Sequence, residues 1–142
     1  MNLFAINWWI VPIGLLVSMI NGSIWYNPKT FFPYWWKIVG GGKEVPGMES
    51  MGMVWGMTAL STIIKTIFIG IAMNAFAPTL GGFSLVNGLL CGFLLWAGVV
   101  LPTYLVNKLF AGHGFGVWAI EIGGHLIDFL VVGALYGVWQ LA

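Results

Sequence analysis

The sequence predicts an all-α membrane protein, a single domain (residues 1–142) that forms a bundle of four transmembrane helices. Its composition is the first observation: 60% of the residues are hydrophobic and only 6% are charged, whereas about a quarter are charged in a soluble domain. The second is that four stretches are apolar over the roughly 20 residues that a helix needs to cross about 30 Å of hydrocarbon. Most of the molecular surface is therefore expected to face lipid.

The four predicted spans end at polar turns or near prolines. Asn27-Pro28 ends the first span, because proline disfavours helical backbone in the residue before it. The second span is expected to stop before Pro78, and the third carries Pro102 near its end. The predicted ranges are 6–26, 51–75, 84–110 and 116–141. The first stretch lacks the basic start and the small-residue cleavage site of a signal peptide, so we expect it to be retained as a span.

The loop between the first two spans, residues 27–50, is expected to hold a short interfacial helix. Its aromatic residues are too few to cross a bilayer, and such residues favour the membrane–water interface. A flexible Gly40-Gly41-Gly42 link follows them. The aromatic residues are Phe31, Phe32, Tyr34, Trp35 and Trp36.

Lysines predict the orientation in the membrane. Three lie in the first loop, one lies in the loop between the third and fourth spans, and the other connections and both termini carry none. Lysine-bearing loops remain in the cytoplasm, so both termini are expected outside it, in a multi-pass protein of the cell (inner) membrane. The four lysines are Lys29, Lys37, Lys43 and Lys108.

Four ionisable residues fall inside the predicted spans. Lys65 lies in the second, and Glu121, His125 and Asp128 lie in the fourth at the spacing i, i+4, i+7, which is one face of a helix. Each costs about 2.5–3.5 kcal/mol at mid-bilayer on insertion scales, so such groups normally face the protein interior with partners. Lys65 and Asp128 lie at similar depths, and we expect them to form an ion pair.

Other polar residues are expected at the same depth, towards the cytoplasm. Pro102 cannot donate a hydrogen bond to the carbonyl of Gly98, which leaves an acceptor there. We therefore predict a polar pocket that opens to the cytoplasm and is floored by Lys65 and Asp128. Its expected members are Lys65, Glu121, His125, Asp128, Asn21, Thr103 and Asn107.

Several roles for this cluster remain open on the sequence. It suits a structural set of ion pairs that fixes the helix register, and it equally suits a proton relay or an ion-coupled transporter or channel subunit, because histidine titrates near neutrality. A metal site is a weaker alternative, since a second set of ligands is missing. No nucleophile–base spacing is evident, so we assign no catalytic residue, metal or cofactor and expect no enzymatic activity.

Pairs of glycines four residues apart predict close helix packing, because small residues let helix backbones approach in lipid. They serve either contacts inside the bundle or contacts between copies. We expect a small membrane protein that assembles with itself or as an accessory subunit of a larger membrane complex, with the lipid bilayer as its other partner. A net charge of +1 gives no basic face for nucleic acid. The pairs are Gly52 and Gly56, Gly88 and Gly92, and Gly133 and Gly137.

Several segments resemble the small bacterial integral membrane proteins of domain-of-unknown-function family 1761. The resemblance covers most of the chain and implies a compact four-helix membrane protein, but no established activity, ligand or catalytic residue. The segments are Asn7-Trp8, then Gly22-Ser23-Ile24-Trp25-Tyr26-Asn27-Pro28 with the aromatic residues that follow, Leu101-Pro102-Thr103 with Asn107 and Phe110, and Gly124-His125-Leu126 with Gly133.

Overall fold

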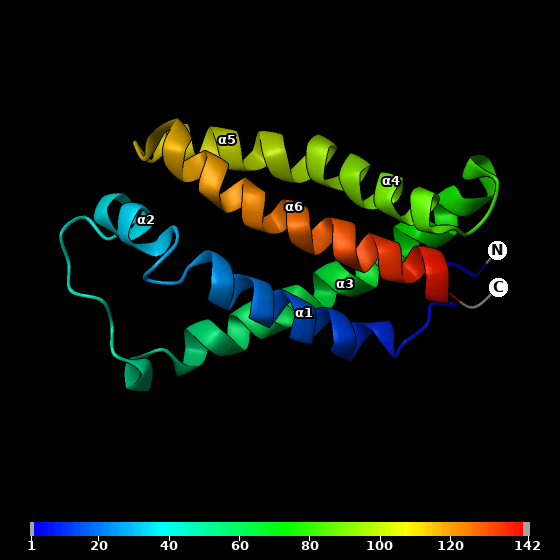
Figure 1. The fold of residues 1–142 in the computed structure, drawn as a ribbon, viewed down its shortest axis with the longest axis horizontal. Coiled ribbons are helices and arrows are strands. Elements are labelled where there is room, and N and C mark those ends of the chain that lie inside the picture. The colour runs from blue at the N-terminus through cyan, green and yellow to red at the C-terminus, as the bar shows by residue number, and fades with distance from the viewer. Residues whose placement is uncertain (1, 141–142) are drawn as a thin grey trace.

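The computed structural model describes residues 2–140, and all regular secondary structure within that range is helical (Figure 1). Short turns or loops separate most of the helices. The elements are α1 (Ile10–Trp25), α2 (Phe32–Val39), the 3₁₀ turn η1 (Met48–Ser50), α3 (Gly52–Leu80), α4 (Leu85–Leu95), the π-helical turn η2 (Trp96–Val100), α5 (Leu101–Phe110) and α6 (Gly114–Trp139).

Three helices are long and apolar enough to cross a membrane: α3, the continuous helix Leu85–Phe110, and α6. The fourth apolar helix, α1, has 16 residues and at 1.5 Å per residue is about 24 Å long. The all-helical class is therefore confirmed, with three long apolar helices and a shorter one. The predicted loop helix corresponds to α2, which is followed by Gly41 and Gly42 at positive φ.

Two prolines that were expected near span ends, Pro78 and Pro102, lie inside helices. Residues 85–110 stay continuous because η2 widens the helix ahead of Pro102, and the Leu101 N–H donates to the carbonyl of Trp96, five residues back. The second span, expected to end at 75, runs on through Pro78 to Leu80. A proline in the last turn removes one backbone hydrogen bond only, and Gly81, in the left-handed conformation, then ends the helix.

The helices run back and forth between two ends of the bundle (Figure 1). Both termini and the α3–α4 turn lie at one end, the terminal end. α2 and the α5–α6 turn lie at the other, the α2 end. α6 is the central helix, since it packs against α1, α2, α3, α4 and α5.

The closest helix contact joins α4 to α6. A Cβ atom on Gly88 would collide with the backbone of Gly133, and one on Gly92 would collide with the backbone at Phe129. A Cβ atom on Gly137 would collide with the backbone carbonyl of Ser84 and would also lie against Gly88. The expected close packing is thus seen for the glycines of these two helices.

The third glycine pair differs from the expectation of packing inside the bundle. A Cβ atom on Gly52 or Gly56 would meet nothing within 4 Å, and residues 52–58 are all exposed. The spacing is the same as in the other pairs, but this part of α3 extends away from the bundle axis (Figure 1). Within residues 2–140, no other helix comes near enough to use it.

The terminal half of the bundle has an apolar core, closed at its end by amide side chains. Ile10, Ile69 and Val132, from α1, α3 and α6, are fully buried in this core. At the end, Asn7 donates to the Trp139 carbonyl at 2.8 Å, and Gln140 donates to Asn74 at 2.6 Å. These bonds tie the segments near both termini to α3.

Candidate functional site

The three ionisable side chains of α6 each bond to a different part of the bundle. Glu121, His125 and Asp128 lie on one face of the helix, as their spacing predicts, and we call this set the α6 polar face. Glu121 and Asp128 are each 7% exposed. Because these two carboxyl groups are buried, the side chains around them decide whether they can carry a charge.

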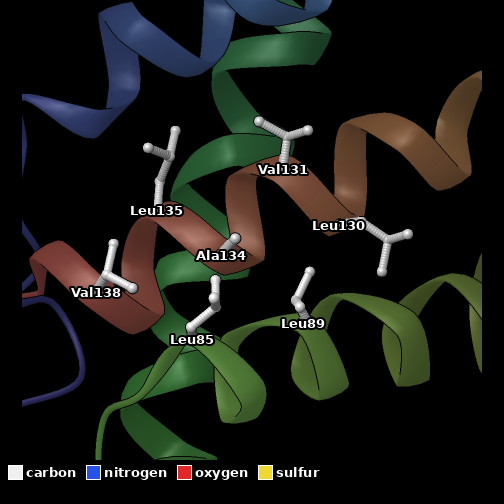
Figure 2. A pocket seen from close by; sticks show the side chains of 7 residues that line it. All are labelled: Leu85, Leu89, Leu130, Val131, Ala134, Leu135 and Val138. Carbon is white, nitrogen blue, oxygen red and sulfur yellow. The ribbon is translucent and has the colours of Figure 1, made fainter.

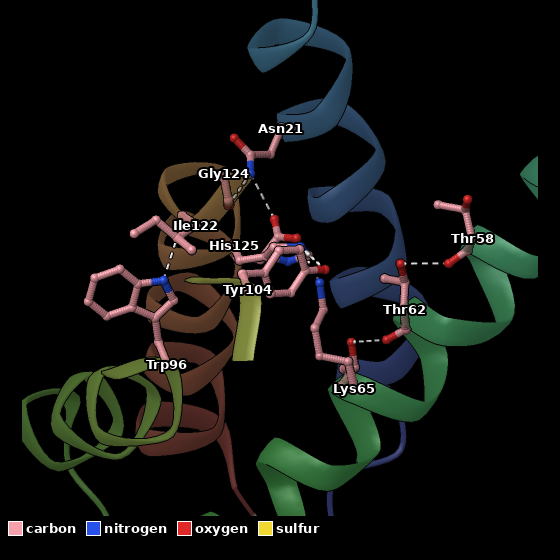
Figure 3. Close-up of polar contacts among 11 residues, drawn as sticks. Asn21, Thr58, Thr62, Lys65, Trp96, Tyr104, Ile122, Gly124 and His125 are labelled. Carbon is pink, nitrogen blue, oxygen red and sulfur yellow. Dashed lines mark hydrogen bonds and ion pairs between the residues drawn. The ribbon is translucent and has the colours of Figure 1, made fainter. Parts of the chain in front are cut away.

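Asp128 joins three helices. Its Oδ2 lies 2.7 Å from Lys65 Nζ on α3, and its Oδ1 accepts a hydrogen bond of 2.9 Å from Asn21 Nδ2 on α1. The same Asn21 amide also donates to the Gly124 carbonyl at 2.9 Å (Figure 3). Both carboxylate oxygens are thus bonded, as a buried charge requires. The structure brings together Asn21, Lys65 and Asp128 in the expected way.

Glu121 has partners that the sequence did not suggest. Lys108 Nζ, from the last turn of α5, lies 3.1 Å from Glu121 Oε2, an ion pair without hydrogen-bond alignment. Trp35 Nε1, from α2, donates to Glu121 Oε1 at 3.0 Å. The side chains of Lys108 and Glu121 are 13% and 9% exposed. This second ion pair therefore attaches α2 and α5 to α6.

His125 lies between the two ion pairs and bonds to a phenol. Its Nε2 is 2.9 Å from the hydroxyl oxygen of Tyr104 on α5, and the ring centroids are 5.0 Å apart (Figure 3). Either group can be the donor, depending on the tautomer of the imidazole. His125 is the one member of the α6 polar face without an oppositely charged partner bonded to it.

Thr103 and Asn107, expected in the polar cluster, lie outside it. Both side chains are exposed, whereas Tyr104 and Lys108, each one residue later, face α6. Successive residues of a helix are about 100° apart, so a difference of one residue decides which side chain faces inward.

Tryptophan side chains bond helix carbonyls inside the bundle. Trp25 Nε1 donates to the Ile120 carbonyl at 2.7 Å, and its ring covers Gly124. Trp96 in η2 donates to the Ile122 carbonyl at 2.8 Å (Figure 3). Gly123 and Gly124 of α6 give the Trp25 ring room to lie against the helix.

The hollow that the structure shows is apolar and lies away from the ion pairs. It has a volume of about 250 Å³ and lies between α4 and α6 in the terminal half of the bundle (Figure 2). Around the α6 polar face, where a polar pocket was predicted, the side chains of Trp25, Trp35 and Tyr104 bond to α6. The hollow is lined by Leu85, Leu89, Leu130, Val131, Ala134, Leu135 and Val138.

Comparison with known proteins identifies the family. The family model described as "Protein of unknown function (DUF1761)" matches residues 9–137. The chain belongs to this family. The match confirms the resemblance seen in the sequence, and its description carries no activity. No significant match was found among curated proteins or solved structures.

The other reactive groups of this DUF1761 protein do not form a second site in residues 2–140. Cys91 is fully buried among apolar side chains. Within the same range, no group of three His, Cys, Asp or Glu side chains is arranged to hold a metal ion. On the α6 polar face the reason is that each group bonds to a partner from another helix.

Two buried hydroxyls near the core have no hydrogen-bond partner among the described residues. They belong to Ser18, which is 8% exposed, and Tyr136, which is fully buried with its ring against Gly70. A buried polar group without a partner costs about 1–3 kcal/mol. The Tyr136 hydroxyl is therefore expected to destabilise the DUF1761 protein.

Tyr136→Phe should leave the free energy of unfolding unchanged or raise it by about 1 kcal/mol, because it removes the unpaired hydroxyl and keeps the ring. Tyr104→Phe is the matched control, since it removes the hydroxyl that bonds His125 and should lower stability. Reversible unfolding in lipid–detergent bicelles measures both. Equal losses for the two variants would contradict the assignment of Tyr136 as unpaired.

Proposed function

We propose that this DUF1761 protein is a four-span integral membrane protein of the inner membrane that has no catalytic activity of its own. In this proposal it assembles with further copies of itself, or as an accessory subunit of a larger membrane complex. The single observation that carries the assembly proposal is the start of α3, residues 52–58, which are all exposed and whose two glycines face open space. The argument for the spans comes first.

The antiparallel arrangement supports α1 as the fourth span. Both termini lie at the same end of the bundle, which requires an even number of crossings (Figure 1). α1 packs along α3 and α6, both of which are long enough to cross. Ile6 is buried just before its start and extends its apolar layer. A short helix crosses by local thinning of the bilayer at modest cost.

The lysines support an orientation with the α2 end in the cytoplasm. Lys29, Lys37 and Lys43 lie in and beside α2, and Lys108 lies in the last turn of α5 at the same end. The terminal end carries no lysine within residues 2–140. Positively charged residues remain on the cytoplasmic side, which places both termini outside the cytoplasm.

The pairing of the buried charges supports a role without catalysis. Lys65 bonds Asp128, and Lys108 pairs with Glu121, so the two carboxylates are occupied inside the chain. A catalytic acid or base must instead be able to reach a substrate. These groups hold helices together in this arrangement.

The start of α3, residues 52–58, is the surface that we propose for assembly. Residues 52–58 are exposed all around the helix, and Met53 is 82% exposed. Gly52 and Gly56 lie four residues apart on one side with open space before them. In lipid, a face of this kind lets a second helix approach closely, whereas the equivalent glycines of α4 and α6 are already used.

The combined variant Gly52→Leu and Gly56→Leu should reduce the native mass of the protein in nanodiscs or mild detergent, because the larger side chains separate the helices. Wild-type protein is expected at a multiple of 15.5 kDa, or in a heteromeric complex when taken from its own membrane. Gly98→Leu is the control, since Gly98 also faces open space but lies on the helix that contains η2.

Two results would contradict assembly through α3. One is a wild-type protein that is monomeric both in nanodiscs and in native membrane extracts. The other is a double variant that keeps the wild-type mass. A reduced mass in the Gly98→Leu control as well would show that the effect is not specific to α3.

A further inference from the structure

His125 is the ionisable group inside the bundle that the proposed function leaves unexplained. Two lysines and two carboxylates form the ion pairs, and their formal charges cancel. His125 bonds to a neutral phenol instead, although a hydrophobic residue would fill the same space at lower cost. A group that changes charge near neutral pH is therefore held between two ion pairs.

The position of His125 couples it to both pairs. It lies one turn from Glu121 and one turn from Asp128, about 6 Å and 4.5 Å along the helix axis. The Lys65–Asp128 pair and the Lys108–Glu121 pair therefore flank it along α6. The titratable or charged groups that face this region are Lys65 from α3, Tyr104 and Lys108 from α5, Glu121 and Asp128 from α6, and Tyr26 at the end of α1.

We propose that His125 is a proton-binding site whose protonation makes Asp128 exchange its partner. With His125 neutral, Asp128 pairs with Lys65 and so holds α3 to α6. A proton from the aqueous phase adds to whichever ring nitrogen lacks one, so that both nitrogens become donors and the Tyr104 hydroxyl oxygen accepts from Nε2. The resulting imidazolium repels Lys65 and attracts Asp128 on its own helix.

The exchange weakens one specific link between helices. Asn21 remains on Oδ1 of Asp128, so α1 stays attached to α6. The 2.7 Å bond from Lys65 to Oδ2, which is the ionic link of α3 to α6, breaks. Proton binding therefore loosens α3, the helix whose start, residues 52–58, already extends away from the bundle.

The test is an NMR titration of ¹⁵N-histidine in lipid nanodiscs. The sequence has two histidines, and His113→Gln leaves His125 as the only signal. We expect the ring to change from the neutral to the cationic pattern as the pH is lowered from about 8 to about 4. In the same samples, the dipolar coupling of Lys ¹⁵Nζ to Asp128 ¹³Cγ should fall over the same pH range.

A pair of lysine variants provides the matched comparison. Lys65→Met removes the neighbouring cation and should increase the proton affinity of His125 about tenfold, or about one pH unit in midpoint. Lys29→Met, in the exposed loop, should leave the midpoint unchanged. If Lys65→Met does not fold, the titration of His125 in the His113→Gln protein alone tests the proposal.

Three outcomes would overturn the proposal. The first is a His125 ring that stays neutral throughout the titration. The second is a ring that titrates while the Lys65–Asp128 coupling stays constant, since the exchange would then not occur. The third is a Lys65→Met midpoint equal to that of Lys29→Met.

Discussion

Asp128→Asn is expected to lower the free energy of unfolding by about 3–5 kcal/mol, the usual cost of removing one partner of a buried ion pair. The variant keeps the shape of the side chain and still accepts a hydrogen bond from Asn21. It leaves the Lys65 ammonium inside the bundle without a counter-charge, and the cost arises from that uncompensated charge.

The double variant Asp128→Asn, Lys65→Met should recover most of that stability, because no unpaired charge remains. Lys29→Met, a change of the same type in the exposed loop, should have an effect near zero. Unfolding equilibria in bicelles of the wild-type protein, Asp128→Asn, Lys65→Met and the double variant give the four free energies of the cycle. A double variant as unstable as Asp128→Asn alone would show that the two residues do not stabilise each other.

Gly88→Val is expected to separate α4 from α6. Its Cβ atom would overlap the backbone carbonyl of Gly133, and a backbone cannot move aside as a flexible side chain does. Overpacking a well-packed site costs about 1–3 kcal/mol, and we expect a larger destabilisation here because two whole helices must move apart. Gly133→Val should act in the same way from the other side of the interface.

Gly98→Val supplies the control for this prediction, because the added side chain meets open space in the same continuous helix as Gly88. Unfolding free energies and the yield of folded protein measure the difference. Equal destabilisation at Gly88 and Gly98 would mean that valine disturbs this helix wherever it is placed, and that the close packing against α6 is not the cause.

The polar face of α6 and its link to Lys65 were predictable from the sequence for a physical reason. A charge in hydrocarbon needs a partner, and helical spacing leaves few candidates at the right depth. Lys65 is the one ionisable residue of α3, so it was the available partner for Asp128. The depth of the residues in the membrane and the helical periodicity were therefore enough to predict the Lys65–Asp128 ion pair.

The Lys108–Glu121 ion pair was not predicted, because it depends on where α5 ends and on how α5 is rotated about its axis. Lys108 was expected in a loop but lies in the last turn of α5, where it faces Glu121. Trp35 reaches the same carboxylate from α2, a helix expected only to lie at the interface. Neither position follows from local pattern, since both depend on how separate helices are placed against each other.

The glycine pairs also show that a local sequence pattern does not reveal which helix will be the partner. Gly88 and Gly92 face α6 in tight packing, whereas Gly52 and Gly56, at the same spacing, face open space. The motif establishes that close approach is possible on that side of a helix. Which helix makes the approach depends on the tertiary arrangement, and for α3, in our proposal, on a partner outside the chain.

The central claim is that α3 and α6 turn their ionic residues towards each other inside the membrane, and a distance measurement tests it most directly. Asp128 is the only aspartate in the sequence, so ¹³Cγ-aspartate labels that one carboxylate. In lipid bilayers above neutral pH, solid-state NMR should detect strong dipolar coupling from ¹⁵Nζ-lysine to this carbon, and Lys65→Met should abolish it. Absent coupling in the wild-type protein, or coupling that persists in Lys65→Met, would contradict the claim.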